Sequence, residues 1–281
     1  GIRVKADPDG PFLSDDKETA ALPWATLRSL EEASRNFEND EGGLSEKWLT
    51  QLIKPGSSLG GARPKVTVVD TKDQLWIAKF PSKNDENDSG AWEIVAHDLA
   101  SLCGLNVPDA KLEKFSNLGS TYLIKRFDRI SKKRVHFASA MTLLGKTDGA
   151  SAADGTSYLD IAAFIKSYGA QPKQDLIELW KRIVFNMAVT NTDDHLRNHA
   201  FILAENGWML SPLYDVNPVP YGDELSLNVD EENNSISIEL AVAVAVKFGF
   251  SETDAKSCAK DILAIVRENW EKRAAGYGLT H

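Results

Sequence analysis

Cysteine is scarce in this chain of 281 residues, which contains only Cys103 and Cys258. Two cysteines so far apart offer neither the spacing of a zinc site nor a disulfide framework, and they fit a reducing compartment. Long hydrophobic runs are also missing, because the longest, residues 240–246, is far shorter than the ~18 apolar residues of a membrane span. With no signal peptide at its start, the chain is expected to be cytoplasmic and without a membrane partner.

Positive charge is in deficit. The chain has 32 Lys and Arg against 41 Asp and Glu, a net charge of −9. A chain that binds DNA directly usually carries a basic surface, so this balance disfavours a DNA-binding function. Internal repeats and low-complexity tracts are absent too. Because the sequence starts at Gly1 rather than Met, an upstream segment of the protein could precede it.

The first half of the chain is predicted to be mostly β. Apolar spacing predicts a helix at 27–37, and Ser45 is expected to cap a second short helix. Strands are predicted at 66–69, 75–80, 110–115 and 121–127, with a helix at 91–102 between them. Residues 1–22 are polar and turn-rich, which is typical of a surface arm.

The chain becomes helical after about residue 130. Helices are predicted at 158–168 and 173–190, and the last 40 residues have a helical pattern. Two short strands, 201–204 and 208–210, flank an expected hairpin turn at Asn206-Gly207. The sequence therefore predicts an α+β fold with a mainly β part followed by a mainly helical part, a pattern that several α+β folds share.

The most informative segment is NTDDHLRN at residues 191–198, which follows an apolar helix and precedes a strand. Asp193 and Asn198 lie five positions apart, which is the spacing in the catalytic loop of protein kinases. There the Asp receives the proton of the attacking hydroxyl and the Asn holds Mg²⁺. By itself the segment fits turn capping equally well, because Asp and Asn both favour turns.

A second carboxylate, Asp215, follows the predicted hairpin in the segment LSPLYDVNP at residues 210–218. Kinases place their second metal ligand after such a hairpin, and hard oxygen ligands suit Mg²⁺. His195 and His199 also invite a metal-site interpretation, but the loop around Asn198 argues against a transition-metal site on one helical face.

Six segments in this order resemble the HipA-like serine/threonine kinases, the toxin components of type II toxin–antitoxin systems. They are SSLGGARPK (57–65), LWIAKFP (75–81), GLNVPDA (104–110), RFDR (126–129), NTDDHLRN (191–198) and LSPLYDVNP (210–218). The resemblance covers roughly residues 55–270. It implies a bilobed kinase-like fold with N-terminal arm and helices at 1–54, an ATP-binding N-lobe at 55–128 and a helical catalytic C-lobe at 129–281.

The resemblance assigns roles to single residues. It implies that Asp193 is the catalytic base and that Asn198 and Asp215 are the Mg²⁺ ligands. It further implies an ATP-binding set in which Lys79 contacts the phosphates, Glu93 pairs with Lys79, Phe127 packs on adenine and His195 orders the catalytic loop. The rest of that set lies on the phosphate-covering loop, which lacks the Walker A pattern: Ser57, Ser58, Gly60, Gly61 and Lys65.

Family members can autophosphorylate a serine of this loop, which ejects the loop and blocks ATP. In this chain Ser58 matches that position and Ser57 lies beside it, so either is a candidate. Arg63 and Lys65 are candidate receivers of the added phosphate charge.

The resemblance also implies a substrate and a partner. The expected substrate is an aminoacyl-tRNA synthetase whose phosphorylation halts translation. The expected partner is a HipB-like helix-turn-helix antitoxin, through which DNA would be contacted only indirectly.

Two departures bear on these expectations. Many members carry another small domain before the loop, whereas only residues 1–55 precede it here, so that domain is expected to be reduced, absent or cut away. The family often has Asp-Gly-His where this chain has Asp193-Asp194-His195. Asp194 is therefore expected either to bind Mg²⁺ indirectly or to face solvent.

Two rival functions remain at this point. One is a nucleotide-binding scaffold or co-repressor without catalysis, which would not need the full set of Lys79, Glu93, Asp193, Asn198 and Asp215. The other is a phosphotransferase of the same broad fold that acts on a small molecule.

Overall fold

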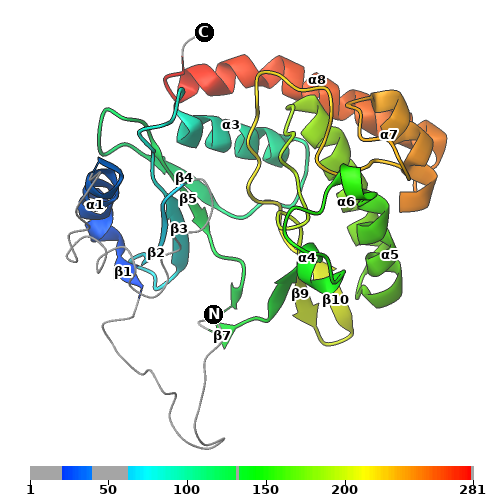
Figure 1. The fold of residues 1–281 in the computed structure, drawn as a ribbon, viewed down its shortest axis with the longest axis horizontal. Coiled ribbons are helices and arrows are strands. Elements are labelled where there is room, and N and C mark those ends of the chain that lie inside the picture. Colours follow the sequence, from blue (N-terminus) through cyan, green and yellow to red (C-terminus); the bar gives the residue numbers. More distant parts are fainter. Residues whose placement is uncertain (1–20, 40–62, 131–132, 280–281) are drawn as a thin grey trace, which may run out of the picture. The chain divides into compact units, whose positions relative to one another are not determined.

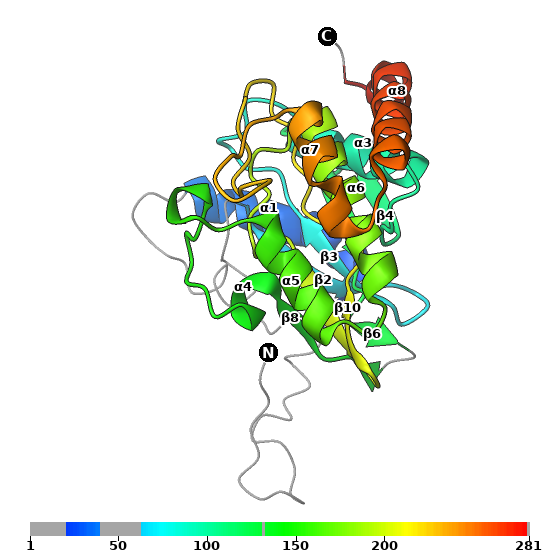
Figure 2. The same cartoon turned by 90° about the vertical axis from the view of Figure 1, so that its right-hand side faces the viewer.

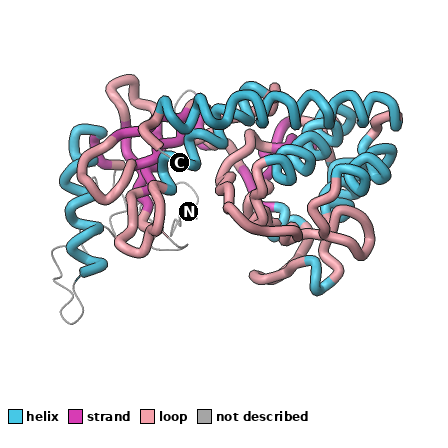
Figure 3. The backbone as a smooth tube through the Cα atoms, turned by 90° about the horizontal axis from the view of Figure 1, so that it is seen from above, coloured by secondary structure: helices cyan, strands magenta, loops and turns pink. Residues whose placement is uncertain are grey.

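The computed structural model describes residues 21–39, 63–130 and 133–279, and these residues form two compact units. The first comprises the described residues of Gly1–Gly90 and Lys111–Arg126, and the second those of Ala91–Ala110 and Phe127–His281. Strands dominate the first unit, whereas helices make up most of the second (Figure 3).

The first unit contains a five-stranded sheet in the order β1-β2-β3-β5-β4. β2 and β3 form an antiparallel hairpin, β3 pairs antiparallel with β5, and β1 pairs parallel with β2. The bounds are β1 Leu22–Pro23, β2 Lys65–Val69, β3 Leu75–Lys79, β4 Ala110–Glu113 and β5 Thr121–Lys125. The predicted strands of this unit are confirmed, and β1 is an edge strand that the polar composition around it did not indicate.

One face of this sheet is covered by α1, Leu27–Asn39, which follows the short 3₁₀ helix η2, Trp24–Thr26 (Figure 1). Side chains alternate between the faces of a strand, so residues at every second position share a face. A core of buried side chains unites Leu27 and Leu30 of α1 with Val66, Val68, Trp76, Ala78, Phe80 and Leu123. The predicted helix at 27–37 is thereby confirmed.

The opposite face of the same sheet carries two lysines. Lys65 and Lys79 are directly opposite each other in the β2–β3 register, on the face that alternates away from the α1 core. Directly opposite like charges destabilise a strand pair unless an anion compensates them. The hairpin therefore places two cations at the same end of one sheet face.

The second unit is built mainly from helices. Its elements are α3 Ser89–Leu102, α4 Ala140–Leu143, η3 Ala152–Asp154, α5 Tyr158–Tyr168, α6 Pro172–Ala188, α7 Ile238–Val244, η4 Ala245–Phe248 and α8 Glu252–Gly276, with strands β6 Arg129–Ile130, β7 Lys133–Arg134, β8 Phe137–Ser139, β9 Ala200–Ala204 and β10 Gly207–Leu210. Of the described helices, none combines the length and apolarity that crossing a bilayer needs.

The centre of the second unit is α6, which packs against α5, α7 and α8 (Figure 2). Pro172 occupies its first turn, where a missing N–H is tolerated. Its predicted apolar stripe is buried as expected: Leu176, Leu179, Trp180, Ile183, Val184 and Met187. The indole Nε1 of Trp180 donates to the carbonyl oxygen of Ala241 at 2.8 Å, which fixes α7 against α6.

A three-stranded antiparallel sheet, in the order β10-β9-β8, lies beside α5. The expected turn at Asn206-Gly207 is shifted by one residue, because Gly207 pairs with Ala204 and the two-residue loop is Glu205-Asn206. Gly207 is needed in the strand instead. Its φ is 136°, and a Cβ there would lie 2.6 Å from the carbonyl oxygen of Tyr168.

The short helix expected after Ser45 and the loop at residues 57–62 lie outside the described residues. The helix predicted at 91–102 is confirmed as α3, most of which belongs to the second unit. The helices predicted at 158–168 and 173–190 are confirmed as α5 and α6, and α8 accounts for most of the helical C-terminal pattern.

We predict that Gly90→Ala destabilises the protein by about 1–3 kcal/mol, the usual effect of overpacking. Gly90 is the second residue of α3, and a Cβ there would lie 2.2 Å from the carbonyl oxygen of Ser120. Thermal unfolding measures the effect. As a control, Gly276→Ala in α8 has open space around the new methyl group, so the higher helix propensity of Ala should add up to about 1 kcal/mol. Equal melting temperatures for the two variants would contradict the close approach of Gly90 to the Ser120 carbonyl.

Candidate active site

The segment 191–199 is a loop between α6 and β9, held at both ends. α6 ends at Ala188, and Thr190 then adopts a left-handed φ of 54°, which is uncommon for a β-branched residue. At the other end, the carbonyl oxygen of His199 accepts from the Ala140 N–H at 2.7 Å, just before β9 begins. The helix and the strand thus fix where the loop starts and stops.

Asp193 and Asn198 are joined across this loop. The side-chain amide Nδ2 of Asn198 donates to the backbone carbonyl of Asp193 at 3.0 Å, and the His195 N–H donates to the same carbonyl at 3.0 Å. Because a carbonyl can only accept, the Asn198 amide group must point its nitrogen there. Among the described residues no donor is found for the remaining amide oxygen of Asn198, so this oxygen can serve as a ligand. The Asp193 side chain is exposed.

Asp194 is buried, with 1 % of its surface exposed, and it anchors the loop to the interior. Its Oδ2 accepts from the hydroxyl of Tyr158 at 2.7 Å and from Nδ2 of Asn186 at 2.7 Å, and it lies 2.9 Å from Nε2 of His199. The expectation that Asp194 faces solvent is therefore wrong, whereas its indirect binding of Mg²⁺ stays a prediction. Three donors on one carboxylate oxygen explain why the group is drawn inward instead.

The environment of Asp194 favours its charged form. Burial by itself raises the pKa of this carboxyl, but the charge and hydrogen bond of His199 and the hydrogen bond from Tyr158 outweigh burial and lower the pKa below its ordinary value. Burial and the Asp194 charge raise the pKa of Tyr158 well above its ordinary value, so its hydroxyl stays a donor. The two shifts have the same consequence, a permanent hydrogen bond between a neutral phenol and a carboxylate.

Asp215 lies in the segment after β10, in a strained backbone conformation. Its φ is 61°, a left-handed value that is rare outside glycine and is concentrated at functional sites. Next to it, the Tyr214 hydroxyl donates to the carbonyl of Arg197 at 2.7 Å. Burial, and then the charge of Asp215, raise the pKa of Tyr214, which keeps that donor protonated. The hydrogen bond ties the Asp215 segment to the loop that carries Asp193 and Asn198.

A second connection runs through asparagines. Nδ2 of Asn191 donates to Oδ1 of Asn186 at 3.1 Å, and Oδ1 of Asn191 accepts from the Asn217 N–H at 3.2 Å. Asn217 in turn donates from Nδ2 to Oδ1 of Asp215 at 3.4 Å. The structure therefore brings Asp193, Asn198 and Asp215 onto one hydrogen-bonded framework inside the second unit.

Two further predicted residues lie in the second unit. Phe127 contacts Tyr214 at a ring-centroid distance of 5.6 Å and Phe137 at 5.7 Å, so its ring is held beside the Asp215 segment. His195, which was expected to order the loop, lies with Nε2 3.3 Å from Nη2 of Arg197. The histidine tied to the interior is His199, whose side chain is fully buried.

The remaining predicted residues are distributed over both units. Lys65 and Lys79 share one face of the first unit's sheet, and Lys79 Nζ lies 5.7 Å from the centre of the Tyr122 ring. Glu93 on α3 is buried, with 3 % exposed, so it is not a solvated surface glutamate. Arg63, a candidate receiver of loop phosphate, pairs with Asp85 at 2.7 Å. Ser57, Ser58, Gly60 and Gly61 lie outside the described residues.

The oxygen groups suit a hard cation better than a transition metal. No cluster of three or more His, Cys, Asp or Glu side chains capable of holding a metal occurs in the described part of the chain. Magnesium does not require one, because it is commonly bound by one or two protein carboxylates together with phosphate oxygens and water. The free amide oxygen of Asn198 and the carboxylate of Asp215 meet that requirement.

Sequence reasoning missed Tyr158, Asn186 and Asn191, which position the loop without carrying chemistry. A signal for one of them was present: Asn186 follows the apolar positions Ile183 and Val184 on α6, and a polar residue in a buried stripe needs partners. Tyr158 gave no comparable signal, because a tyrosine at the start of a helix is ordinarily part of the core.

Residues 57–270 match the family described as HipA-like C-terminal domain. The chain belongs to this family. The match includes the loop 191–199, the Asp215 segment and the two lysines of the first unit.

Curated relatives carry names that describe kinases. A Sinorhizobium fredii protein named "Putative kinase Y4mE" is 28% identical over 191 residues, which cover 59% of this chain and 43% of that protein. A second S. fredii protein, "Putative kinase Y4dM", is 27% identical over 258 residues, which cover 84% of this chain and 56% of that protein. The HipA-like chain thus spans about half the length of these relatives.

Among solved structures, HipA of Shewanella oneidensis MR-1, in a complex with HipB and operator DNA, superposes with a TM-score of 0.60 at 20% identity. The alignment covers 80% of this chain and 59% of the Shewanella chain. This confirms the predicted α+β, HipA-type kinase fold, with a mixed sheet in the N-terminal part and a helical C-terminal part.

We predict that Asp194→Asn destabilises the protein by about 1.5–3 kcal/mol, the contribution of hydrogen bonds to a charged group. The asparagine carbonyl oxygen can take the place of Oδ2 and still accept, but the charge that strengthens these three hydrogen bonds is lost. Since the pKa of Asp194 is lowered on folding, its contribution is present above the ordinary value of 3.8 and is lost only as the pH falls below it. Thermal unfolding at neutral pH measures the loss.

The matched control is the neighbouring Asp193→Asn, which removes the same charge from an exposed side chain and should leave the melting temperature within the small range of surface substitutions. If the melting temperature of Asp194→Asn equals that of Asp193→Asn, the Asp194 carboxylate does not anchor the loop.

Proposed function

We propose that this HipA-like chain is an ATP-dependent kinase that phosphorylates a serine or threonine hydroxyl of a protein. The observation that carries the proposal is the orientation of Asn198: its amide nitrogen is held by the Asp193 carbonyl, which leaves an oxygen for a metal beside an exposed carboxylate. Family membership and the kinase names of curated relatives support the same reaction.

Asp193 is proposed as the catalytic base. The acceptor oxygen bonds to the γ-phosphorus of ATP, the bond from that phosphorus to the bridging oxygen of ADP breaks, and the hydroxyl proton passes to the Asp193 carboxylate. Asp193 is suited to this role because its side chain is exposed while its backbone carbonyl is fixed by two hydrogen bonds. Such positioning supplies much of the catalysis in phosphoryl transfer.

Asn198 and Asp215 are proposed to hold Mg²⁺. When bound, magnesium neutralises charge on the phosphate oxygens and orients them. The left-handed backbone of Asp215 and its link through Asn217 to Asn191 keep this carboxylate in one position. The protein contribution is therefore a rigid pair of oxygen ligands.

The remaining ATP contacts are proposed from the resemblance. Lys79 contacts phosphates with Glu93 as its ion-pair partner, and Phe127 and His195 are assigned to the nucleotide side. Ser57, Ser58, Gly60 and Gly61 are proposed to belong to the phosphate-covering loop, and Lys65 begins β2 directly after it. The two directly opposed lysines of β2 and β3 support an anionic ligand on that sheet face. Autophosphorylation is proposed at Ser58 or Ser57.

The substrate and partner are proposed on the family resemblance alone. We propose an aminoacyl-tRNA synthetase as the substrate, so that phosphorylation halts translation. We propose a HipB-like helix-turn-helix antitoxin as the partner, with DNA contacted only through it. The Shewanella HipA structure is a complex with HipB and operator DNA, an assembly of that protein.

We predict that Asp193→Asn lowers phosphoryl transfer by about 10²–10⁴-fold while ATP binding is retained, because the variant lacks only the base. The measurement incubates each protein with Mg²⁺ and γ-labelled ATP, alone and with a bacterial lysate, and maps any labelled peptide. Equal labelling by the variant would remove Asp193 from the catalytic role.

The acceptor distinguishes the rival functions. Label on the chain or on one lysate protein supports a protein kinase, and label only in the small-molecule fraction indicates a metabolite phosphotransferase. ATP binding without any label, from protein shown by intact mass to be unphosphorylated, indicates a scaffold.

We predict that Asp215→Asn weakens Mg-ATP binding by about tenfold or more, because one metal ligand loses its charge. Isothermal titration calorimetry with and without Mg²⁺ measures this, and the loss should disappear when Mg²⁺ is omitted. Glu205→Gln, which removes an exposed charge from the β9–β10 turn of the same unit, serves as the control. An unchanged affinity in Asp215→Asn would argue against a metal at this residue.

A further inference from the structure

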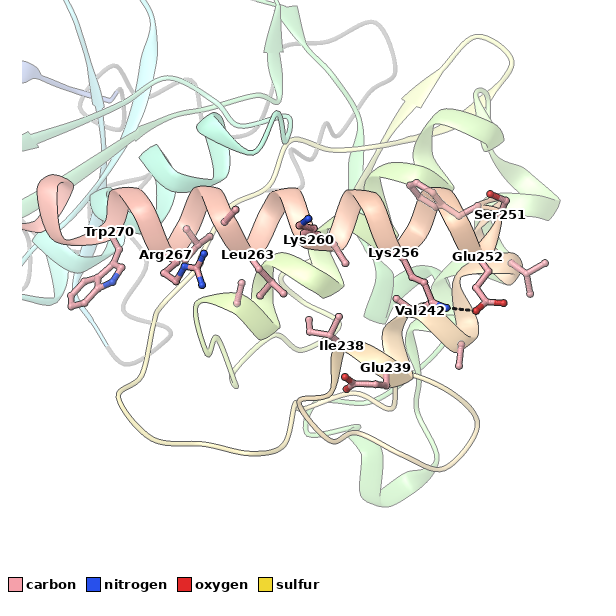
Figure 4. A pocket seen from close by; sticks show the side chains of 17 residues that line it. Ile238, Glu239, Val242, Ser251, Glu252, Lys256, Lys260, Leu263, Arg267 and Trp270 are labelled. Carbon is pink, nitrogen blue, oxygen red and sulfur yellow. Dashed lines mark hydrogen bonds and ion pairs between the residues drawn. The ribbon is translucent and has the colours of Figure 1, made fainter.

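A groove with a volume of about 1360 Å³ runs along α8, with α7 and η4 forming its other wall (Figure 4). Its floor includes Ala188, the last residue of α6, so the groove borders the helix that leads into the Asp193 loop. None of its lining residues belongs to the proposed catalytic, ATP-binding or metal-binding set.

The α8 wall of the groove carries three basic side chains among apolar ones. Lys256, Lys260, Leu263, Arg267 and Trp270 succeed one another at intervals of three or four residues, which places them on one face of the helix. This stripe extends over roughly 20 Å at the rise of 1.5 Å per residue. Its length suits a partner helix of about four turns.

The facing wall is mostly apolar, with the carboxylate of Glu239 as an exception. Ile238 and Val242 are one helical turn apart on α7, and Val246 on η4 continues the line. Val246 is 73% exposed and adjoins the partly exposed Ile238 and Val242, so the three form a contiguous apolar strip. The groove thus combines a strip of accessible apolar surface with a strip of positive charge.

The positive charge is only partly compensated. Lys256 pairs with Glu252, and Glu239 on α7, which accepts from the Ser237 hydroxyl, adds one negative charge to the lining. For Lys260 and Arg267, no ion pair is found among the residues that the structure describes. The chain as a whole has a net charge of −9, so these two cations form a local exception that selects for a negatively charged occupant.

We propose that this groove binds an amphipathic acidic helix of a partner protein. Apolar side chains of that helix would contact Ile238, Val242 and Val246, and its carboxylates would face Lys260 and Arg267. A helix is favoured over an extended strand because both walls are helices and offer no unpaired sheet edge. Nucleic acid would satisfy the cations but leave the valines uncovered.

The test uses two designed helical peptides with the same apolar face, one flanked by glutamates and the other by lysines. Fluorescence anisotropy measures their binding to the wild-type chain and to Lys260→Glu/Arg267→Glu. The wild type should prefer the acidic peptide by on the order of tenfold, and the charge-reversed variant should prefer the basic one. A preference that is absent, or unchanged by the reversal, would overturn the proposal.

Two controls separate the groove from general electrostatics. Lys173→Glu/Lys272→Glu makes the same change in net charge at exposed positions that do not line the groove, and it should keep the wild-type preference. Val246→Ser should weaken both peptides equally, because it removes apolar contact without altering charge. Circular dichroism confirms that each variant is folded. Equal effects of both double variants, or full displacement of the peptide by a single-stranded oligonucleotide, would show charge attraction without a helix site.

Discussion

The buried carboxylate of Asp194 is the constraint on which the candidate active site depends. It receives donors from α5 through Tyr158, from α6 through Asn186 and from the end of its own loop through His199. A charged group without these partners would not be stable at 1 % exposure. Burial of Asp194 therefore requires that both helices and the loop keep one arrangement, which in turn holds the backbone of the neighbouring Asp193.

The oxygens that we propose as metal ligands are fixed by backbone more than by their own side-chain contacts. Asn198 is oriented by the Asp193 carbonyl, and Asp215 is aimed by a left-handed φ that few residues other than glycine adopt. The tyrosine beside it, Tyr214, bonds to the Arg197 carbonyl, so the two segments move together. Phosphoryl transfer gains most from such positioning, because the protein has little covalent chemistry to perform.

The sequence allowed most elements to be predicted, because their apolar periodicity is strong, as in the stripe from Leu176 to Met187 on α6. The short strands β1 and β8 were not predicted, because a strand of two or three residues is too short to show an apolar period. In the candidate site, the five-residue spacing together with the family resemblance pointed to Asp193, Asn198 and Asp215. Neither indicated that Asp194 is buried, because only the partners contributed by distant helices decide that.

The environment of Asp194 also explains how this chain can carry Asp193-Asp194-His195 where HipA-like kinases often have Asp-Gly-His. A glycine is required where φ is positive or where a Cβ would clash, and Asp194 is not among the positive-φ residues of the described chain, which are Asp73, Thr190 and Asp215 apart from glycines. A side chain is therefore admissible there. In this chain the side chain adds a buried anion that orders the loop through Tyr158, Asn186 and His199, so the rigidity comes from hydrogen bonds. The substitution is thus coupled to those three residues, and none of them can be exchanged for an apolar side chain without leaving a buried charge short of a donor.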